Sequence, residues 1–260
     1  MQSYYRWLSL LAWLPAGAAA FQPLITDDTG TQGAGGNQLE FGYTRFVEKE
    51  PGTKTVATTL PFVYTLGLTD ALDGYIGGSA VRFRPNAPDN PQTGAGNTLA
   101  GLKWRFYEHE ASKVSLALRS EIRFPVSERA ENRGLGDAKS NAGAALLLSQ
   151  ETGFGAIHAN LAVSSRRYAL PGNQAIHRDA LWRLSVAPVF DITEQWRIVF
   201  DAGLVTNPHS AEKYRMGYVE AGAIYAPTRN LDLAFGIIRD IDHQGHRVHM
   251  VTAGVTWRFR

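Results

Sequence analysis

Hydrophobic and polar residues alternate with a period of two along most of the chain, a pattern typical of β-strands with one apolar and one polar face. In residues 250–259, Val251, Val255 and Trp257 share one face, whereas Thr252 and Arg258 share the other. Similar segments recur, and each is followed by Gly, Pro, Asn or charged residues that favour turns. The pattern predicts twelve antiparallel strands, at residues 37–48, 54–66, 73–84, 97–107, 113–124, 138–150, 154–166, 179–190, 195–206, 213–225, 230–240 and 246–259.

The connections between the predicted strands alternate in length. Short ones such as Thr69-Asp70 and Thr193-Glu194 alternate with longer ones, such as 85–97 and 125–137, that are rich in Pro, Gly, Asn and charge. Transmembrane barrels have short periplasmic turns and longer external loops, whereas a soluble β-sandwich gives no reason for this regularity. The predicted fold class is therefore all-β, a transmembrane antiparallel barrel of about 12 strands over residues 37–260, with ten or fourteen strands as alternatives.

The N-terminus has the features of a secretory signal peptide. Arg6 supplies a positive charge, residues 7–15 are largely apolar, and the small residues 17–20 offer a cleavage site, so we predict a signal peptide at residues 1–20. Residues 21–36 are rich in Gly, Thr and Asp, and we expect an irregular periplasmic segment that either plugs the barrel or hangs free. No later stretch approaches the roughly 18 apolar residues that a membrane-spanning helix requires.

Composition and charge narrow the classes of function. The chain carries 26 Lys and Arg against 24 Asp and Glu, a formal net charge of +2, and its basic residues are scattered singly. Nucleic-acid binding, which depends on clustered basic residues, is therefore not expected. Because there is no cysteine, disulfides, thiolate metal sites, a cysteine nucleophile and an acylated N-terminal cysteine are excluded. The expected localisation is the bacterial outer membrane, with its lipid and lipopolysaccharide and the barrel-insertion machinery as partners.

Aromatic residues lie near many predicted strand ends, as in the interfacial girdles of membrane barrels. The chain also ends in Trp257-Arg258-Phe259-Arg260, close to the aromatic terminus of many outer-membrane barrels. The predicted girdle residues are Phe46, Tyr64, Phe83, Trp104, Phe106, Phe124, Phe154, Trp182, Phe190, Trp196, Tyr225 and Trp257.

The segment 23–33, PLITDDTGTQG, followed by Gln38-Leu39-Glu40, resembles the start of the mature outer-membrane proteins in the family called putative MetA-pathway of phenol degradation. The rest of the chain resembles that family in strand spacing and in glycine and aromatic content. The resemblance implies a transporter-like outer-membrane barrel that moves small, often aromatic or hydrophobic compounds. It supplies no catalytic residues.

If the apolar faces of the strands contact lipid, their charged faces line the lumen. A barrel of this strand number leaves a narrow interior, and an Arg-rich wall would favour anions or aromatic acids through Arg–carboxylate and cation–π contacts. The predicted function is therefore a channel for small organic solutes, aromatic or anionic ones included. The predicted solute path consists of Arg82, Lys103, Arg105, Arg119, Glu121, Arg123, His158, Arg183, Arg197, Asp201, Glu220 and Arg258.

Two other functions stay open. The same charges could form salt bridges that seal the lumen, which would make the protein a structural barrel. An outer-membrane lipid hydrolase fits less well, because no G-x-S-x-G elbow occurs and no Ser, His and acid are shown to converge. We therefore predict no catalytic residue and no enzymatic activity.

Three histidines could suggest a metal site. His243, His246 and His249 recur every third residue near Asp240 and Asp242, in what we interpret as the last external hairpin. A loop lacks the supporting hydrogen bonds that metal ligands need, so a solvated, titrating rim is the favoured interpretation. Neither a metal nor another cofactor is expected.

Overall fold

The computed structural model describes residues 23–50, 52–86, 90–241 and 247–260, which contain thirteen strands and two short helices. The predicted signal peptide, residues 1–20, lies outside these residues. The strands are β1 (Asn37–Glu50), β2 (Thr53–Gly67), β3 (Leu72–Arg84), β4 (Gln92–Ala95), β5 (Leu99–His109), β6 (Val114–Arg123), β7 (Asn141–Thr152), β8 (Gly155–Ser165), β9 (Ala180–Asp191), β10 (Trp196–Thr206), β11 (Arg215–Thr228), β12 (Leu231–Asp240) and β13 (Arg247–Phe259). The helices are α1 (Glu128–Asn132) and α2 (Pro171–Ile176).

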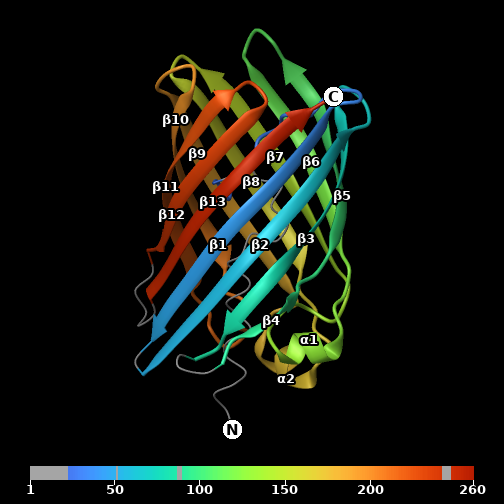
Figure 1. The fold of residues 1–260 in the computed structure, drawn as a ribbon, viewed down its shortest axis with the longest axis vertical. Coiled ribbons are helices and arrows are strands. Elements are labelled where there is room, and N and C mark those ends of the chain that lie inside the picture. Colours follow the sequence, from blue (N-terminus) through green and yellow to red (C-terminus); the bar gives the residue numbers. More distant parts are fainter. Residues whose placement is uncertain (1–22, 51, 87–89, 242–246) are drawn as a thin grey trace.

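The long strands form one closed antiparallel barrel (Figure 1). Each long strand pairs with its neighbours in sequence, and β1 also pairs with β13, from Asn37 opposite Phe259 to Lys49 opposite Arg247. Because β4 only adds to one side of β3, the wall consists of twelve long strands. The predicted fold class is confirmed.

The short strand β4 was not predicted. It pairs with Ala80–Phe83 of β3, whereas β5 pairs only with Leu72–Gly77 of that strand. The four residues of β4, Gln-Thr-Gly-Ala, carry no apolar alternation, so the period-two pattern could not reveal them.

The two ends of the barrel differ. Asn37, Phe259 and the short connections after β2, β5, β7, β9 and β11 lie at one end, here called the turn end. The longer connections, with α1 and α2, and the short β1–β2 connection lie at the other, here called the loop end (Figure 1). Each helix is short and starts with a local signal. Ser127 caps α1 by accepting a hydrogen bond from the backbone N–H of Ala130, and a proline begins α2.

The outer face of the barrel is apolar around its middle. Phe41, Leu60, Ile76, Leu161 and Phe235 are each at least half exposed, as expected of side chains that contact lipid rather than water. Aromatic pairs such as Trp196 with Tyr225 and Trp257 with Phe259 lie at the turn end, as predicted for a girdle. Among the described residues, no helix is long and apolar enough to cross a membrane.

The polarity of the two faces inverts near the loop end. On β1, Glu40 points inward and Phe41 outward, but four to six residues later Arg45 is exposed and Phe46 is fully buried. Phe46 and Phe83 are corrections to the predicted girdle, because they pack inside the barrel. Their inner apolar cluster contains Ile25, Phe46, Ala57, Val81, Phe83, Leu135, Tyr218, Ile238, Val248 and Met250.

Candidate functional site

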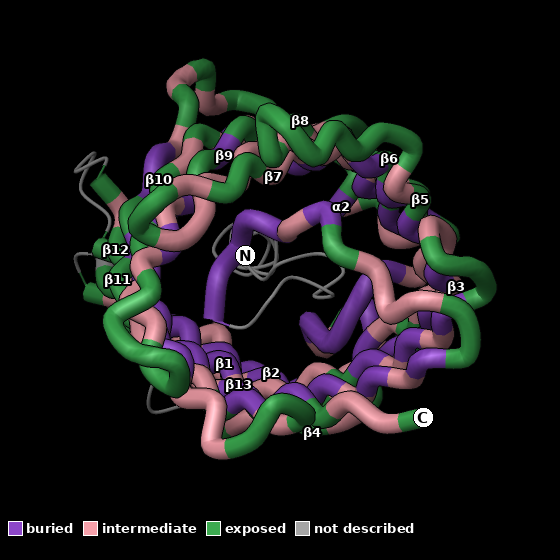
Figure 2. The backbone as a smooth tube through the Cα atoms, turned by 90° about the horizontal axis from the view of Figure 1, so that it is seen from above, coloured by how far each residue is buried: buried purple, intermediate pink, exposed green. Residues whose placement is uncertain are grey.

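The chain segment before β1, residues 23–36, lies inside the barrel (Figure 2). Asp201 of β10 accepts hydrogen bonds from the backbone N–H groups of Ile25 (3.0 Å) and Thr26 (2.7 Å) and from the Thr26 hydroxyl (2.9 Å). Further along, Asp73 of β3 accepts from the backbone N–H of Gln32 at 3.1 Å. Six steps of strand order separate β10 from β3 in a wall of twelve long strands, so the segment crosses the full width of the lumen.

The middle of this segment is held by neutral contacts as well. Asp27 and Asn160 exchange two hydrogen bonds, from the Asp27 N–H to the amide oxygen (2.7 Å) and from the Asn160 amide to the Asp27 carbonyl (2.8 Å). The Ser149 hydroxyl accepts from the backbone N–H of Thr29 at 3.0 Å. These bonds satisfy the backbone of a segment that has no secondary structure of its own.

A charged cluster joins the segment to the wall between β5 and β6. The Lys103 ammonium lies 3.2 Å from Asp27 and 3.3 Å from Asp28, and the Arg119 guanidinium lies 3.5 Å from Asp27 and 3.2 Å from Glu121. Lys103, Arg119 and Asp27 are each less than a tenth exposed. Removing one partner of such a buried pair leaves the other charge uncompensated, so this cluster is expected to anchor the segment.

Two tyrosines complete the polar network by lying over glycines of the neighbouring strand. The Tyr75 hydroxyl accepts a hydrogen bond from Arg119 Nε (2.9 Å) and donates to the Ser120 carbonyl (3.0 Å), and a Cβ at Gly101 would lie 2.3 Å from its ring. Tyr218 likewise lies over Gly203 and donates to Asp201 at 3.0 Å. A side chain at either glycine would displace the tyrosine that fixes a charged group.

A cavity of about 100 Å³ lies on the loop-end side of the segment, with Ile25 in its wall. Its charged lining consists of four arginines, Arg119, Arg123, Arg166 and Arg183, and one acid, Glu121. Glu121 pairs with Arg119 and, at 3.0 Å, with Arg123. Within the described residues, no hydrogen bond or ion pair joins a protein group to the Arg183 side chain, and its Nε is buried without a partner. The remaining lining is mostly small or apolar, including Gly143, Ala145, Ala162 and Ser164.

Two larger cavities lie on the turn-end side of the segment. One of about 670 Å³ is lined by Arg105, His158 and Arg197, among others, and one of about 480 Å³ by Lys103, Arg197 and Arg258. Asp232 pairs with both Arg197 (3.2 Å) and Arg258 (2.9 Å). The cations at this end are therefore largely neutralised within the wall.

The predicted solute-path residues separate into groups. Lys103, Arg119, Glu121, Arg123, Arg183, Arg105, His158, Arg197 and Arg258 line the three cavities. Asp201 binds the segment, and Glu220 is 3% exposed, with a carboxylate oxygen so close to Gly236 that a Cβ there would lie 2.5 Å from it. Arg82 is a correction, because it is exposed on the outer face of β3 while its neighbours Val81 and Phe83 are buried inside.

Glu131 joins two loops, a role that was not predicted from the sequence. Its carboxylate is fully buried and accepts hydrogen bonds from the N–H groups of Ala138 (2.7 Å), Ala169 (2.9 Å) and Leu170 (2.9 Å) and from the Asn173 amide (2.8 Å). Burial acts to raise the pKa of Glu131, but these hydrogen bonds outweigh it and lower the pKa below its ordinary value. The β6–β7 and β8–β9 loops thus form one folded loop cap, here residues 124–140 and 166–179.

His177 lies within the loop cap. It is 4% exposed, its ring lies 4.7 Å from the Tyr168 ring in a tilted arrangement, and its Nδ1 forms a hydrogen bond with the Asn173 carbonyl at 2.8 Å. Burial lowers the pKa of His177 to about 4. The Tyr168–His177 pair is therefore built around a neutral imidazole.

The histidines predicted to form a titrating rim are only partly described. His243 and His246 lie outside the described residues, and His249 lies on the outer face of β13, opposite Val47 and Arg239. In the described ranges, no group of three His, Cys, Asp or Glu side chains is placed to hold a metal ion.

Two serine–histidine contacts bear on the hydrolase alternative. Ser149 Oγ lies 2.8 Å from His158 Nδ1, and Ser112 Oγ lies 2.9 Å from His109 Nδ1 in the β5–β6 turn. The first serine also accepts the Thr29 N–H, so it supports the segment. Neither contact includes a hydrogen bond from the imidazole to an acid among the described residues, as a catalytic triad would require.

The barrel resembles solved outer-membrane structures. The COG4313 outer membrane channel from Pseudomonas putida F1 superposes with a TM-score of 0.71 at 12% identity, covering 89% of this chain and 98% of that one. The NanC porin gives a TM-score of 0.56 at 12% identity (84% and 98% covered), and the CymD monoaromatic hydrocarbon channel 0.54 at 10% identity (88% and 89% covered). At these identities the likeness shows the fold.

No sequence among the curated proteins matches the chain. The family model described as "Putative MetA-pathway of phenol degradation" matches residues 20–259. With its closed barrel and apolar outer face, the chain is a protein of the bacterial outer membrane, and it belongs to the family that this model describes.

Proposed function

We propose that the protein is an outer-membrane channel for small organic solutes and that it favours aromatic solutes with an acidic group. The observation that carries this proposal is the loop-end cavity. Four arginines and one glutamate line it, and no hydrogen bond or ion pair joins Arg183 to another described residue, although Asp201 and Tyr218 interact with it electrostatically. A guanidinium with free donors is a good receptor for a carboxylate or phenolate, and a bidentate contact adds geometric selectivity.

The lining of the cavity supports an aromatic solute. At about 100 Å³ the cavity is smaller than the roughly 150 Å³ that holds benzene in a well-studied protein core, so a ring enters it only when the wall or the segment moves. Small side chains such as Gly143 and Ala162 leave room beside the guanidinium, and the Tyr218 ring also borders it. The family description and the monoaromatic hydrocarbon channel of similar fold point to the same class of compound.

Passage from this cavity to the turn-end cavities requires residues 23–36 to move. The segment separates them, because Ile25 lines the loop-end cavity while Asp28 and Gly30 line both turn-end cavities. We propose that the segment acts as a gate and that the loop end faces the outside of the cell, as in barrels with short periplasmic turns.

A flux measurement with a matched pair of solutes tests the acidic preference. Liposomes containing the purified barrel should take up benzoate faster than benzyl alcohol, and Arg183→Gln should lower benzoate uptake about tenfold, the value of one charge-assisted hydrogen bond. Arg129→Gln is the control, because it removes a cation from α1 that is exposed outside the cavity. Equal loss in both variants would contradict the assignment to Arg183.

A sealed structural barrel is the second candidate, and one observation favours it. The segment and its ion pairs fill the middle of the lumen, with Lys103, Arg119 and Asp27 all buried. A barrel that gives no solute uptake and no current, although it is folded and heat-modifiable, would support this alternative.

A further inference from the structure

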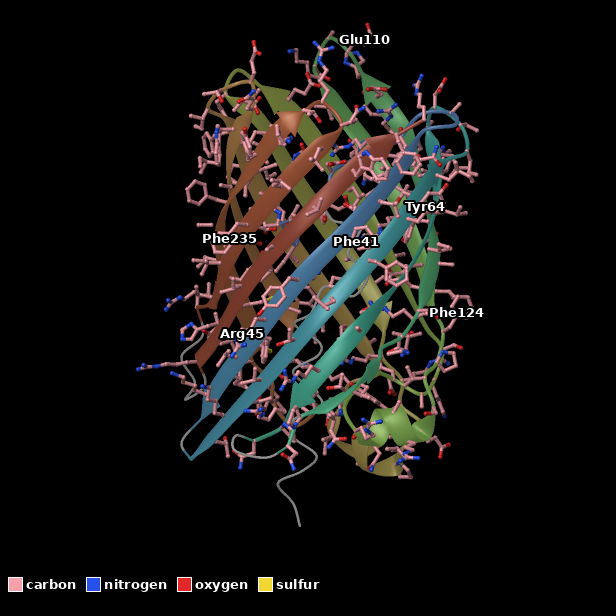
Figure 3. The ribbon with its side chains drawn as sticks, viewed as in Figure 1. Phe41, Arg45, Tyr64, Glu110, Phe124 and Phe235 are labelled. Carbon is pink, nitrogen blue, oxygen red and sulfur yellow. The ribbon has the colours of Figure 1, made fainter. Side chains whose placement is uncertain are left out.

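The outer face of the barrel carries a basic patch near the loop end, on the five adjacent strands β3, β2, β1, β13 and β12. These strands are neighbours in the sheet, and Arg45 of β1 is seen near their loop end, beyond Phe41 (Figure 3). The patch consists of Arg45, Lys49, Lys54, Arg82, Arg84, Arg239 and Arg247.

Strand register places these cations in three rows. Arg45 and Arg82 lie in one row, each opposite Thr58 of β2. In the next row, Arg84 and Arg239 lie on either side of Val56, Val47 and His249. Lys49 forms the last row with its two cross-strand partners, Lys54 and Arg247. Adjacent strands are about 4.8 Å apart, so cations in one row lie roughly 5 to 20 Å apart.

No protein group neutralises the patch within the described residues. None of its seven side chains has a hydrogen bond or ion pair there, and all are exposed except Arg84, which is half-buried. The outward positions of the five strands, which are odd-numbered on β1, β12 and β13 and even-numbered on β2 and β3, contain no Asp or Glu. Like charges this close repel one another, so a bound anion would stabilise the arrangement.

The patch begins where the lipid-facing surface ends. On β12, Leu233, Phe235 and Ile237 are exposed apolar residues, and Arg239 is the next outward position. The opposite side of the barrel lacks this change: its outward residues at the loop end include Ile122, Phe124, Val163 and Leu204, all more than 40% exposed. The cations therefore mark one sector of the membrane boundary rather than a general rim.

We propose that this patch is a binding site for the phosphorylated headgroup of a glycolipid of the outer leaflet, the lipopolysaccharide class. Basic residues at a membrane boundary bind anionic lipid headgroups, and arginines bind phosphate through paired donors. The apolar side chains below Arg45, Arg82 and Arg239 would contact the acyl chains of the same molecule. A second phosphate on the same headgroup would contact the cations of a neighbouring row.

The test measures how much glycolipid the folded barrel retains. The variant Arg45→Gln/Arg82→Gln/Arg239→Gln removes one cation from each of three strands. Its control, Arg129→Gln/Lys139→Gln/Arg167→Gln, removes three exposed cations of the loop cap, which connects strands β6 to β9 on the other side of the barrel. Binding of diphosphorylated lipopolysaccharide is measured in detergent by native mass spectrometry, and heat-modifiable migration verifies that each variant is folded.

The patch variant is expected to bind the glycolipid about fivefold more weakly for each cation removed, whereas the control should bind like the unmodified protein. Enzymatically dephosphorylated glycolipid should bind the unmodified protein weakly. Equal binding by the patch variant would overturn the proposal, and so would an equal loss in the control. Displacement by millimolar inorganic phosphate, or equal binding of phosphatidylglycerol, would show a general anion site and would also overturn it.

Discussion

Two arginines of the lumen, Arg119 and Arg183, have the same chemistry but different surroundings. Arg119 lies in the middle of the lumen, where Asp27, Glu121 and Tyr75 satisfy its donors. Arg183 borders the loop-end cavity, where no hydrogen bond or ion pair joins it to another described residue. A satisfied arginine contributes to structure, whereas an unsatisfied one is available to a ligand. Arginine in a lumen is therefore evidence for a solute path only when its partners are known.

The largest effect is expected from removing Asp27, the carboxylate that pairs with Lys103 and Arg119. Asp27→Ala removes the buried carboxylate that Lys103 and Arg119 share and leaves them Asp28 and Glu121, so the loss should lie at the lower end of the roughly 3–5 kcal/mol for breaking a buried pair. The segment should then leave the lumen, and single-channel conductance should rise severalfold. Thr31→Ala is the control, since it removes only a contact to the Asp70 carbonyl near the surface. Unchanged conductance in Asp27→Ala would mean that the segment does not limit passage.

A second buried, satisfied charge lies in the loop cap. Glu131→Gln replaces a carboxylate that accepts four hydrogen bonds with an amide that must turn a donor toward donors, so the cap should lose roughly 2–3 kcal/mol. Hydrogen exchange at the amides of residues 128–140 and 168–177 should accelerate. Glu128→Gln, in the same helix but exposed, should leave these amides protected. Equal exchange in the two variants would show that Glu131 does not hold the cap.

A smaller effect is expected from Arg123, which lines the loop-end cavity together with Arg183. Arg123 lines the same cavity as Arg183, but Glu121 neutralises it at 3.0 Å. Arg123→Gln should therefore lower benzoate uptake only roughly two- to threefold, less than Arg183→Gln does. If the two variants are equally impaired, the presence of a protein partner does not decide which arginine receives the solute.

The stability of the loop cap is also expected to depend on pH. His177 faces Tyr168, Arg166, His209 and Glu131, and burial lowers its pKa to about 4. Between its ordinary pKa of 6.5 and 4, only the unfolded cap binds a proton at His177, so stability should fall as the pH falls through this window. The lowered pKa of Glu131 extends the loss below its ordinary 4.5.

Amide exchange of the cap, corrected for intrinsic rates, should therefore be faster at pH 4.5 than at pH 7. His177→Phe, which cannot bind a proton, should remove most of this difference. A difference that is unchanged in His177→Phe would assign the pH dependence to other groups.

The sequence predicted most of the barrel because lipid and lumen impose opposite polarity on alternate residues. Each of the twelve predicted strands corresponds to a long strand, with boundaries that differ by up to a few residues. The pattern fails at the loop end, where outward positions leave the lipid and inward positions pack against the cap. There Arg45 and Arg82 point outward while Phe46 and Phe83 point inward, the reverse of the middle of the wall.

The contacts of the site could not be predicted in the same way. Asp27 and Asp28 are polar residues of an irregular segment, and nothing local in the sequence distinguishes a free tail from one that crosses the lumen. Their partners Lys103, Arg119 and Asn160 lie 75 to 133 residues away in the chain. Which arginine is paired and which is free depends on these long-range contacts, so the solute-path residues could be predicted only as a set.

The most direct test of the gate is to fix residues 23–36 to the barrel wall by a disulfide. The hydroxyls of Thr26 and Ser185 are 2.7 Å apart, and the chain has no other cysteine, so Thr26→Cys/Ser185→Cys allows a single disulfide between segment and wall. We predict that benzoate uptake by this variant is nearly abolished when oxidised and returns on reduction. Equal uptake in both states would contradict the claim that residues 23–36 are the gate.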